Sequence, residues 1–401
     1  MVTESFLPQV NGVTNSVLRI CEQMQARGHE VLVVAPGPGP RSYAGAQVVR
    51  APSMPMPGYA DFRLARPWPQ LTATLRTFRP DVVHLASPAV LGAQAAFAAH
   101  RLDLPLVAVY QTDLAGFARR YGLSRLESGL WRWLRTVHGL AGRTLAPSRA
   151  AVAQLREHGV DRVAQWARGV DLERFDPARR DPELHRRLAA GGEVVVGYVG
   201  RLAHEKQVSL LASLQSVPGV RLVVVGDGPQ RRQLEQQLPR ARFLGQLSGT
   251  ELASTFASMD VFVHTGAHET FCQAAQEALA SGLPVVAPAA GGLLDLVEPE
   301  QTGLLFAPGC GDDLRAQVAR LVQDPGTRTA MGLAARQSVA GRGWNVLADQ
   351  LLGHYTEVRA RHGDAVQARH DDAVRARHDD AVRARHDAEV RARHDDAVHA
   401  A

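Results

Sequence analysis

Short apolar runs alternate with amphipathic stretches along most of the chain. In the first half, this pattern predicts strands at residues 30–35, 81–85 and 106–110 and helices at 12–27, 67–78, 90–101 and 126–140. A second series predicts strands at 194–199, 221–225, 242–244, 261–264 and 284–287, with a helix at 270–281. Such alternation is typical of βαβ units around a parallel sheet. The sequence therefore predicts an α/β protein with two Rossmann-like domains.

A polar stretch at residues 168–177 separates the two series and predicts the domain boundary. We assign residues 1–168 to the first domain and 169–343 to the second. Residues 344–360 predict a helix, and the sequence leaves open whether this helix returns to the first domain. Residues 361–401 repeat eight-residue units such as VRARHDDA, and eight residues advance about 80° beyond two helical turns. Because no apolar stripe results, we expect this low-complexity tail to be disordered or a frayed helix.

The composition indicates the cellular compartment of the protein and the kind of partner that it binds. No apolar run approaches the roughly 20 residues that span a bilayer, and the first residues do not resemble a signal peptide. The three cysteines are too few for a disulfide framework, so we expect a cytoplasmic protein. The net charge of +5 favours anionic partners. Among 45 basic residues only Lys206 is a lysine, which suggests a site that needs a compact ammonium, although chance survival is the alternative.

Two segments lie at predicted helix starts, and one of them is positively charged. In GRLAHEK, Arg201 and Lys206 follow a strand and open a predicted helix. Asn11 and Gly12 precede another helix, where backbone amides are able to approach a phosphate. Cations and helix N-termini together suit a diphosphate. A solvated basic helix start and an ordinary glycine cap are the alternatives.

Two carboxylates mark the segment HETFCQAAQE. Glu269 lies just ahead of the predicted helix and Glu277 lies two turns inside it. Eight helical residues rise roughly 12 Å, about the span from a sugar to a ribose across a diphosphate. One carboxylate is therefore able to accept hydrogen bonds from sugar hydroxyls and the other from ribose hydroxyls. The alternative is that Glu269 only interacts with the helix dipole and Glu277 is exposed.

Taken together, these segments resemble retaining glycosyltransferase family four, which has the GT-B fold. The resemblance covers residues 1 to about 358 and rests on TESFLPQVNGV, RGVDLERF, GRLAHEK, VVVGDGP and HETFCQAAQEALASGLPVVAP. Within that family the chain looks most like the GDP-mannose-dependent α-mannosyltransferases that act on glycolipids. The resemblance implies two Rossmann-like domains facing a cleft, and transfer of a hexose, mannose from GDP-mannose, to a lipid-linked or glycolipid acceptor. A UDP-sugar donor and a nucleotide-sugar epimerase remain alternatives.

The resemblance also implies roles for individual residues. Glu269 holds the donor sugar, Glu277 binds the ribose, and Arg201 and Lys206 bind the diphosphate opposite Gly12. The backbone of Thr270, Phe271, Cys272 and Gln273 lies beneath the phosphates, and Leu247, Ser248 and Gly249 contact the base. No metal or other cofactor is expected, because cations and helix N-termini offset the charge of the leaving diphosphate.

The chain departs from the family at Gln111, where many relatives carry histidine. Glutamine cannot shuttle a proton near neutral pH, so we assign no general base there and expect Gln111 to hydrogen-bond the sugar or the acceptor. Relatives also have four or five apolar residues ahead of VTESF, so the start is expected to be truncated or misassigned.

Other classes of protein fit less well. The GDGP segment lacks the third glycine of a dinucleotide fingerprint, which argues against an oxidoreductase. A phosphorylase usually needs a cofactor lysine, for which only Lys206 is available. The near-neutral Arg–Asp repeats argue against nucleic-acid binding.

Residues 119–143 carry six arginines, Trp131 and Trp133. Both a core-facing helix and a peripheral contact with anionic lipid at the inner face of the membrane remain open.

Overall fold

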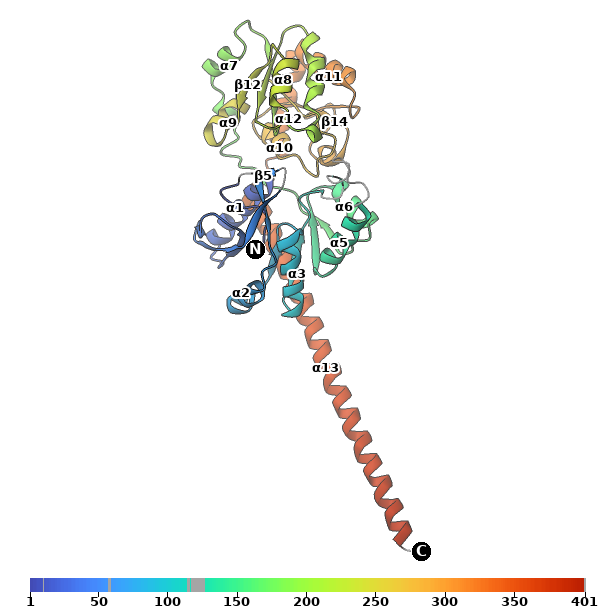
Figure 1. Cartoon of the computed structure of the whole chain (residues 1–401). Coiled ribbons are helices and arrows are strands. Elements are labelled where there is room, and N and C mark those ends of the chain that lie inside the picture. The colour runs from blue at the N-terminus through green and yellow to red at the C-terminus, as the bar shows by residue number, and fades with distance from the viewer. Residues whose placement is uncertain (10, 57–58, 114–115, 117–126, 400–401) are drawn as a thin grey trace.

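The computed structural model describes residues 1–9, 11–56, 59–113, 116 and 127–399. Two α/β domains face each other, and one long helix runs away from them to the C-terminus (Figure 1). Contacts between the domains are specific: the Thr270 hydroxyl donates to the Gln111 carbonyl oxygen, and Arg149 pairs with Asp295 at 2.7 Å. The predicted class, an α/β protein with two parallel-sheet domains, is confirmed.

The second domain is built on a fully parallel six-stranded sheet. Its strands are β10 (Val194–Val199), β11 (Val220–Val225), β12 (Arg242–Gly245), β13 (Val261–Val263), β14 (Val285–Pro288) and β15 (Gly303–Phe306). They are ordered β12-β11-β10-β13-β14-β15, so the direction in which the chain adds strands reverses between β10 and β13. In open α/β sheets, ligands bind beyond the carboxyl ends of the strands at such a switch point.

Helices cover both faces of this sheet. They are α7 (Pro182–Leu188), α8 (Arg231–Gln237), α9 (Gly249–Ala257), α10 (Gln273–Ala280), α11 (Gly311–Gln323) and α12 (Pro325–Ser338), with short 3₁₀ helices η2 (Pro177–Arg179), η3 (His204–Lys206), η4 (Val208–Ser216) and η5 (Gly291–Asp295). Because both faces are covered, the central strands are buried except at their ends and consist of continuous apolar runs such as VVVGYV.

The first domain repeats this arrangement with a shorter first strand. Its strands are β1 (Leu32–Pro36), β2 (Ser42–Tyr43), β3 (Ala46–Ala51), β6 (Val83–Leu85), β7 (Leu106–Val109), β8 (Arg143–Ala146) and β9 (Val163–Gln165), beside a hairpin of β4 (Ser53–Met56) and β5 (Tyr59–Ala65). Val2 forms parallel bridges to both Val34 and Leu85, and so joins β2-β3-β1 to β6-β7-β8-β9. The switch point of this sheet therefore lies at Val2.

In the part of the first domain that the structure describes, the helices that pack on its sheet include α1 (Gly12–Ala26), α2 (Gln70–Phe78), α3 (Val90–Arg101), α5 (Glu127–Gly139) and α6 (Arg149–Glu157). Asn11 caps α1, since its Oδ1 accepts from the Thr14 amide at 3.0 Å. Ser148 caps α6 in the same form, with its hydroxyl accepting from the Ala151 amide at 3.1 Å. Both caps fix where the preceding loop ends, at the edge that faces the second domain.

The final helix, α13 (Trp344–His399), begins after the second domain and packs on the first. Leu347, Leu351, Tyr355 and Val358 are buried in the first domain's core, and the Tyr355 hydroxyl lies 2.7 Å from Nδ1 of His84. The sequence left disorder or a frayed helix open for residues 361–401, and in the structure the helix continues through the repeats to His399. Val366, which lies in these repeats, is exposed.

Candidate functional site

The loops that follow β10 and β13 meet at the switch point of the second domain and bring Lys206 and Glu269 together. Nζ of Lys206 lies 2.5 Å from Oε1 of Glu269. Nε2 of His264, the residue directly after β13, lies 3.0 Å from the same oxygen. One carboxylate is thus held by two basic side chains from the two strands that flank the reversal.

Sequence reasoning placed His264 at the end of a strand but gave it no role. It is buried, and its ring stacks on that of Tyr198 with centroids 6.0 Å apart and planes 11° from parallel. Burial alone would lower the pKa of His264, but the neighbouring Cys272 and Glu269 outweigh it and raise this pKa to about 9. The signal that would have found it is a polar residue ending an otherwise apolar strand at a switch point.

The charges in this cluster stabilise one another. Burial opposes ionisation of Glu269, but Lys206 and His264 hold the pKa of its carboxyl well below the usual range. Burial likewise works against the Lys206 ammonium, yet Glu269 leaves the pKa of Lys206 raised. The site therefore presents an ionised carboxylate between two cations, which is suited to accepting hydrogen bonds from hydroxyl groups.

His264, Glu269 and Cys272 each place one potential metal-ligand atom within 4.8 Å of the others. The carboxylate of this group already carries Lys206 at 2.5 Å, so a metal ion would have to displace the ammonium. These residues consequently suit an internal ion-pair network better than a metal centre.

The start of α10 corrects the predicted spacing of the two acids. The helix begins at Gln273 rather than residue 270, because Cys272 has a left-handed backbone with φ +83° that cannot continue a helix. Glu277 therefore lies about one turn inside α10, and the predicted rise over eight helical residues is wrong. Glu277 is half-buried beside Gln273, and burial raises its pKa to about 8.

A second correction concerns the segment GRLAHEK. It opens the 3₁₀ helix η3 and not an α-helix, because Gln207 adopts a left-handed conformation directly after Lys206. The dipole of a long helix is thus absent here, and Arg201 is exposed in the loop that precedes η3. Gly226 supports this loop: a Cβ at Gly226 would lie 2.0 Å from the carbonyl oxygen of Gly200.

The remaining predicted donor residues border the same edge of the second domain. Ser248 and Gly249 are exposed at the start of α9, after β12, and Leu247 is half-buried against the core. Phe271 and Cys272 are buried in the core, which leaves mainly their backbone for a ligand. Thr270 donates to the Gln111 carbonyl oxygen of the first domain, and Gln273 donates to the Gly169 carbonyl oxygen at the domain boundary.

On the first-domain side, Gln111 follows β7 and is buried. Its side-chain nitrogen donates to the Ala86 carbonyl oxygen at 3.1 Å, and its Oε1 accepts from Nη2 of Arg168 at 2.6 Å. Gly12 opens α1 nearby, where a Cβ would lie 2.8 Å from Nη1 of Arg168. The structure therefore brings Gln111 and Gly12 together around Arg168, to which sequence reasoning gave no role beyond the domain boundary.

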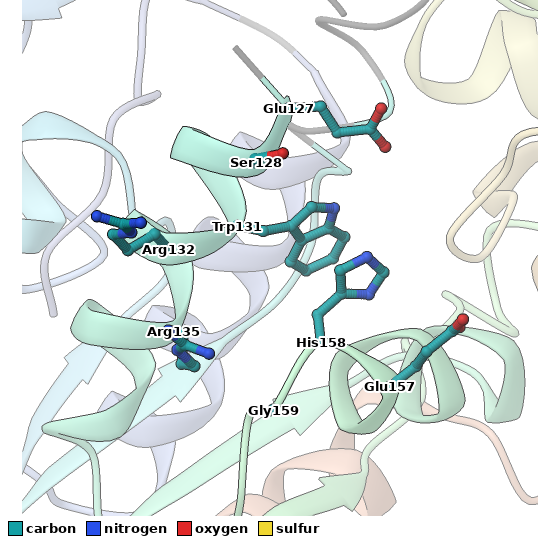
Figure 2. A pocket seen from close by; sticks show the side chains of 8 residues that line it. All are labelled: Glu127, Ser128, Trp131, Arg132, Arg135, Glu157, His158 and Gly159. Carbon is teal, nitrogen blue, oxygen red and sulfur yellow. The ribbon is translucent and has the colours of Figure 1, made fainter. Parts of the chain in front are cut away.

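A separate cavity of about 600 Å³ opens between α5 and α6 (Figure 2). The Trp131 and His158 rings stack in it at 3.7 Å between centroids, beside Arg132 and Arg135. The described residues that line the cavity include none of the predicted donor residues. Leu134 and Val137 are buried, so the face of α5 that carries them packs into the core. Leu126 and the arginines at 119, 120 and 125 lie outside the described residues.

Comparison with known proteins places this arrangement in a family. Residues 10–174 match the family model described as Glycosyltransferase Family 4, and residues 180–338 match Glycosyl transferases group 1. The chain belongs to glycosyltransferase family 4. The family predicted from the motifs is thereby confirmed, as is an enzyme that transfers a glycosyl group.

Curated relatives extend the match over most of the chain. A protein of Mycobacterium tuberculosis named GDP-mannose-dependent alpha-mannosyltransferase is 51% identical over 368 residues, which cover 90% of this chain and 97% of that protein. A protein of the same name from Corynebacterium glutamicum is 46% identical over 366 residues, covering 90% and 89%.

Solved structures share the fold. Anabaena HepE in complex with UDP has a TM-score of 0.75 at 21% identity, covering 89% of this chain and 98% of that one. Sucrose-phosphate synthase from Thermosynechococcus elongatus has a TM-score of 0.72 at 22% identity, covering 90% and 99%. The predicted GT-B arrangement of two Rossmann-like domains is confirmed. Within the described ranges, the structure contains no helix with the length and apolarity needed to cross a bilayer.

Proposed function

We propose that this enzyme transfers mannose from GDP-mannose, with retention of configuration, to a lipid-linked or glycolipid acceptor. The observation that carries the proposal is the Lys206–Glu269 pair at the switch point of the second domain, with 2.5 Å between Nζ and Oε1. The names of the relatives that are 46% and 51% identical support the donor and the sugar.

In this proposal, the second domain binds the donor. The Glu269 carboxylate accepts hydrogen bonds from hydroxyls of the mannose, and Glu277 accepts them from the ribose. Arg201, Lys206 and the backbone amides of residues 270–273 offset the negative charge that develops on the leaving diphosphate. The base lies against residues 247–249. Because protein cations supply this charge, catalysis needs neither a metal ion nor another cofactor.

Binding measurements test the donor. Purified protein is titrated with GDP, UDP and ADP and with their sugars, followed by turnover with candidate lipid acceptors in the presence and absence of EDTA. GDP and GDP-mannose should raise the melting temperature most, and EDTA should leave the rate unchanged. Preference for UDP would overturn the mannose assignment, and loss of activity in EDTA would implicate the His264–Glu269–Cys272 group.

Lys206→Ala and Glu277→Ala should lose donor binding, while Glu300→Ala, at an exposed surface ion pair, should not.

We also propose a peripheral contact with anionic membranes through α3 and α5. Phe97 and Trp133 are both exposed, with ring centroids 6.4 Å apart, and the exposed Arg132 adjoins them. Exposed aromatic rings beside arginine suit a bilayer interface. Co-sedimentation with vesicles rich in phosphatidylglycerol should fall in the double variant Phe97→Ser, Trp133→Ser. Equal sedimentation of the variant and the parent protein would remove this surface from the proposal.

A further inference from the structure

Arg168 is a half-buried cation held by a neutral partner. It follows β9 (Val163–Gln165), and the one hydrogen bond that the described residues give its guanidinium runs from Nη2 to Oε1 of Gln111, at 2.6 Å. Its Nε is fully buried and has no hydrogen-bond partner among the residues that the structure describes. A guanidinium has five N–H donors, so most of its capacity is unused.

The surroundings of Arg168 are electrostatically unfavourable for a cation. Nη1 lies at the first residue of α1, since a Cβ at Gly12 would be 2.8 Å away, and the N-terminus of this 15-residue helix is itself positive. Burial lowers the pKa of Arg168 to about 10, against the opposing effect of Glu269. That carboxylate is already held by Lys206 and His264. Positive charge therefore exceeds negative charge in this cluster.

We propose that Arg168 binds the diphosphate of the nucleotide-sugar donor from the first-domain side, opposite Lys206. The inference rests on the proposed function and extends its donor site. A phosphate oxygen supplies both the negative charge and the hydrogen-bond acceptors that the guanidinium lacks. The space against Gly12 is taken by the guanidinium, so the diphosphate is held through Arg168 and not by the α1 backbone alone.

Gln111 and α10 set the position of this cation. The amide oxygen of Gln111 accepts from Arg168 at any pH, whereas a protonated histidine in its place would repel the guanidinium. The backbone of the arginine is fixed as well: Gln276 of α10 donates to the Arg168 carbonyl oxygen at 2.9 Å, and Gln273 donates to that of Gly169 at 3.1 Å. The helix that carries Glu277 thus also anchors Arg168.

Nucleotide binding by Arg168→Met tests the proposal. Methionine retains an unbranched apolar stem but has no charge and no N–H donors. We expect GDP to bind the variant roughly 10- to 100-fold more weakly than the parent protein, with the affinity for guanosine unchanged. Arg168→Lys, which keeps the charge but not the fork, should lie between the two. Arg221→Met is the matched control, because Arg221 also has a buried Nε without a partner in the described structure but pairs with Glu193 at 2.5 Å, away from the site.

Each outcome decides between defined alternatives. Unchanged GDP affinity in both Arg168 variants would overturn the proposal. If, in addition, the KM for a phosphate-bearing acceptor rises, the residue binds the acceptor phosphate instead. Should Arg168→Met fail to fold, as a thermal melt would show, the Arg168→Lys titration alone decides. If the parent protein binds no guanine or uridine nucleotide, the proposed function fails, whereas normal binding by the parent and by both variants rejects only the role of Arg168.

Discussion

The two sides of the proposed donor site differ in how their charges are paired. On the second-domain side, Lys206, His264 and Glu269 satisfy one another, with both basic nitrogens within 3.0 Å of a single carboxylate oxygen. On the first-domain side, the Arg168 guanidinium contacts the neutral amide of Gln111 at 2.6 Å. One side thus has an internal counter-charge and the other lacks it.

This difference indicates two ways of contributing to the same reaction. Paired charges fix the position of a carboxylate before the donor binds, so that sugar hydroxyls meet a preorganised acceptor. A cation with a neutral partner gains its counter-charge only when an anion arrives, and its contribution appears as binding energy. Variants of the Glu269 carboxylate should therefore affect turnover most, and variants of Arg168 should affect nucleotide affinity.

The largest expected effect is that of Glu269→Gln. Glutamine keeps the size of the side chain but removes the charge that Lys206 and His264 hold in place. We expect kcat to fall by roughly 10²- to 10³-fold while GDP binds within about threefold of the parent affinity, because in the proposed donor site the carboxylate contacts the sugar and not the nucleotide. Glu183→Gln, which alters an exposed surface pair, is the control. An equal loss of GDP affinity and of kcat would abolish the proposed division between the two sides.

A smaller effect is expected for His264→Gln, and it should depend on pH. The pKa of His264 is raised to about 9 from an ordinary value of 6.5, so the stabilisation from its charge is fully present below pH 6.5 and is lost as the pH rises through 9. Urea unfolding should show the variant less stable by about 1–3 kcal/mol at pH 6, with the gap narrowing towards pH 10. A gap that stays constant with pH would show that His264 acts through packing on Tyr198 alone.

Gly12→Ala tests the first-domain side with a few-fold effect. The new Cβ would lie 2.8 Å from Nη1 of Arg168, the far end of a flexible side chain that is able to shift by tenths of an ångström. We expect GDP affinity to fall by about three- to tenfold in the parent background and to change little in Arg168→Met. Equal losses in both backgrounds, in a double-mutant cycle measured by calorimetry, would show that Gly12 contacts the donor directly.

Helices and strands whose pattern is set by their own residues were predicted well from the sequence. Strands such as Val194–Val199 are apolar throughout because helices cover both faces of the sheet, and the helix expected at residues 12–27 begins at Gly12, where Asn11 caps it. Lys206 and Glu269 were singled out by motif and by the rarity of lysine, and the fold places them in contact. Short or exposed strands such as Ser42–Tyr43 gave no comparable pattern.

The features that were missed depend on distant parts of the chain. The role of Arg168 cannot be read from its own segment, because it depends on contacts with Gln111, 57 residues earlier, and with Gly12. The role of His264 likewise depends on the pairing of β13 with β10, which brings the loop with Lys206 and His264 to the Glu269 carboxylate. The late start of α10 follows from the left-handed backbone of Cys272, which residue preferences do not predict for a cysteine.

The smallest effect is expected from removing the repeats, residues 364–401. The buried part of α13 ends near Val358, and beyond it Arg369 pairs with Asp103 at 2.9 Å, with both side chains about half exposed or more. Such exposed pairs contribute little, so the melting temperature should change by no more than about 2 °C and kcat by less than about twofold. Truncation at residue 346 instead removes Leu347, Leu351 and Tyr355 from the core and should unfold the first domain. A large loss of turnover in the 364–401 deletion, with its melting temperature intact, would assign the repeats a role in the reaction that neither side of the donor site explains.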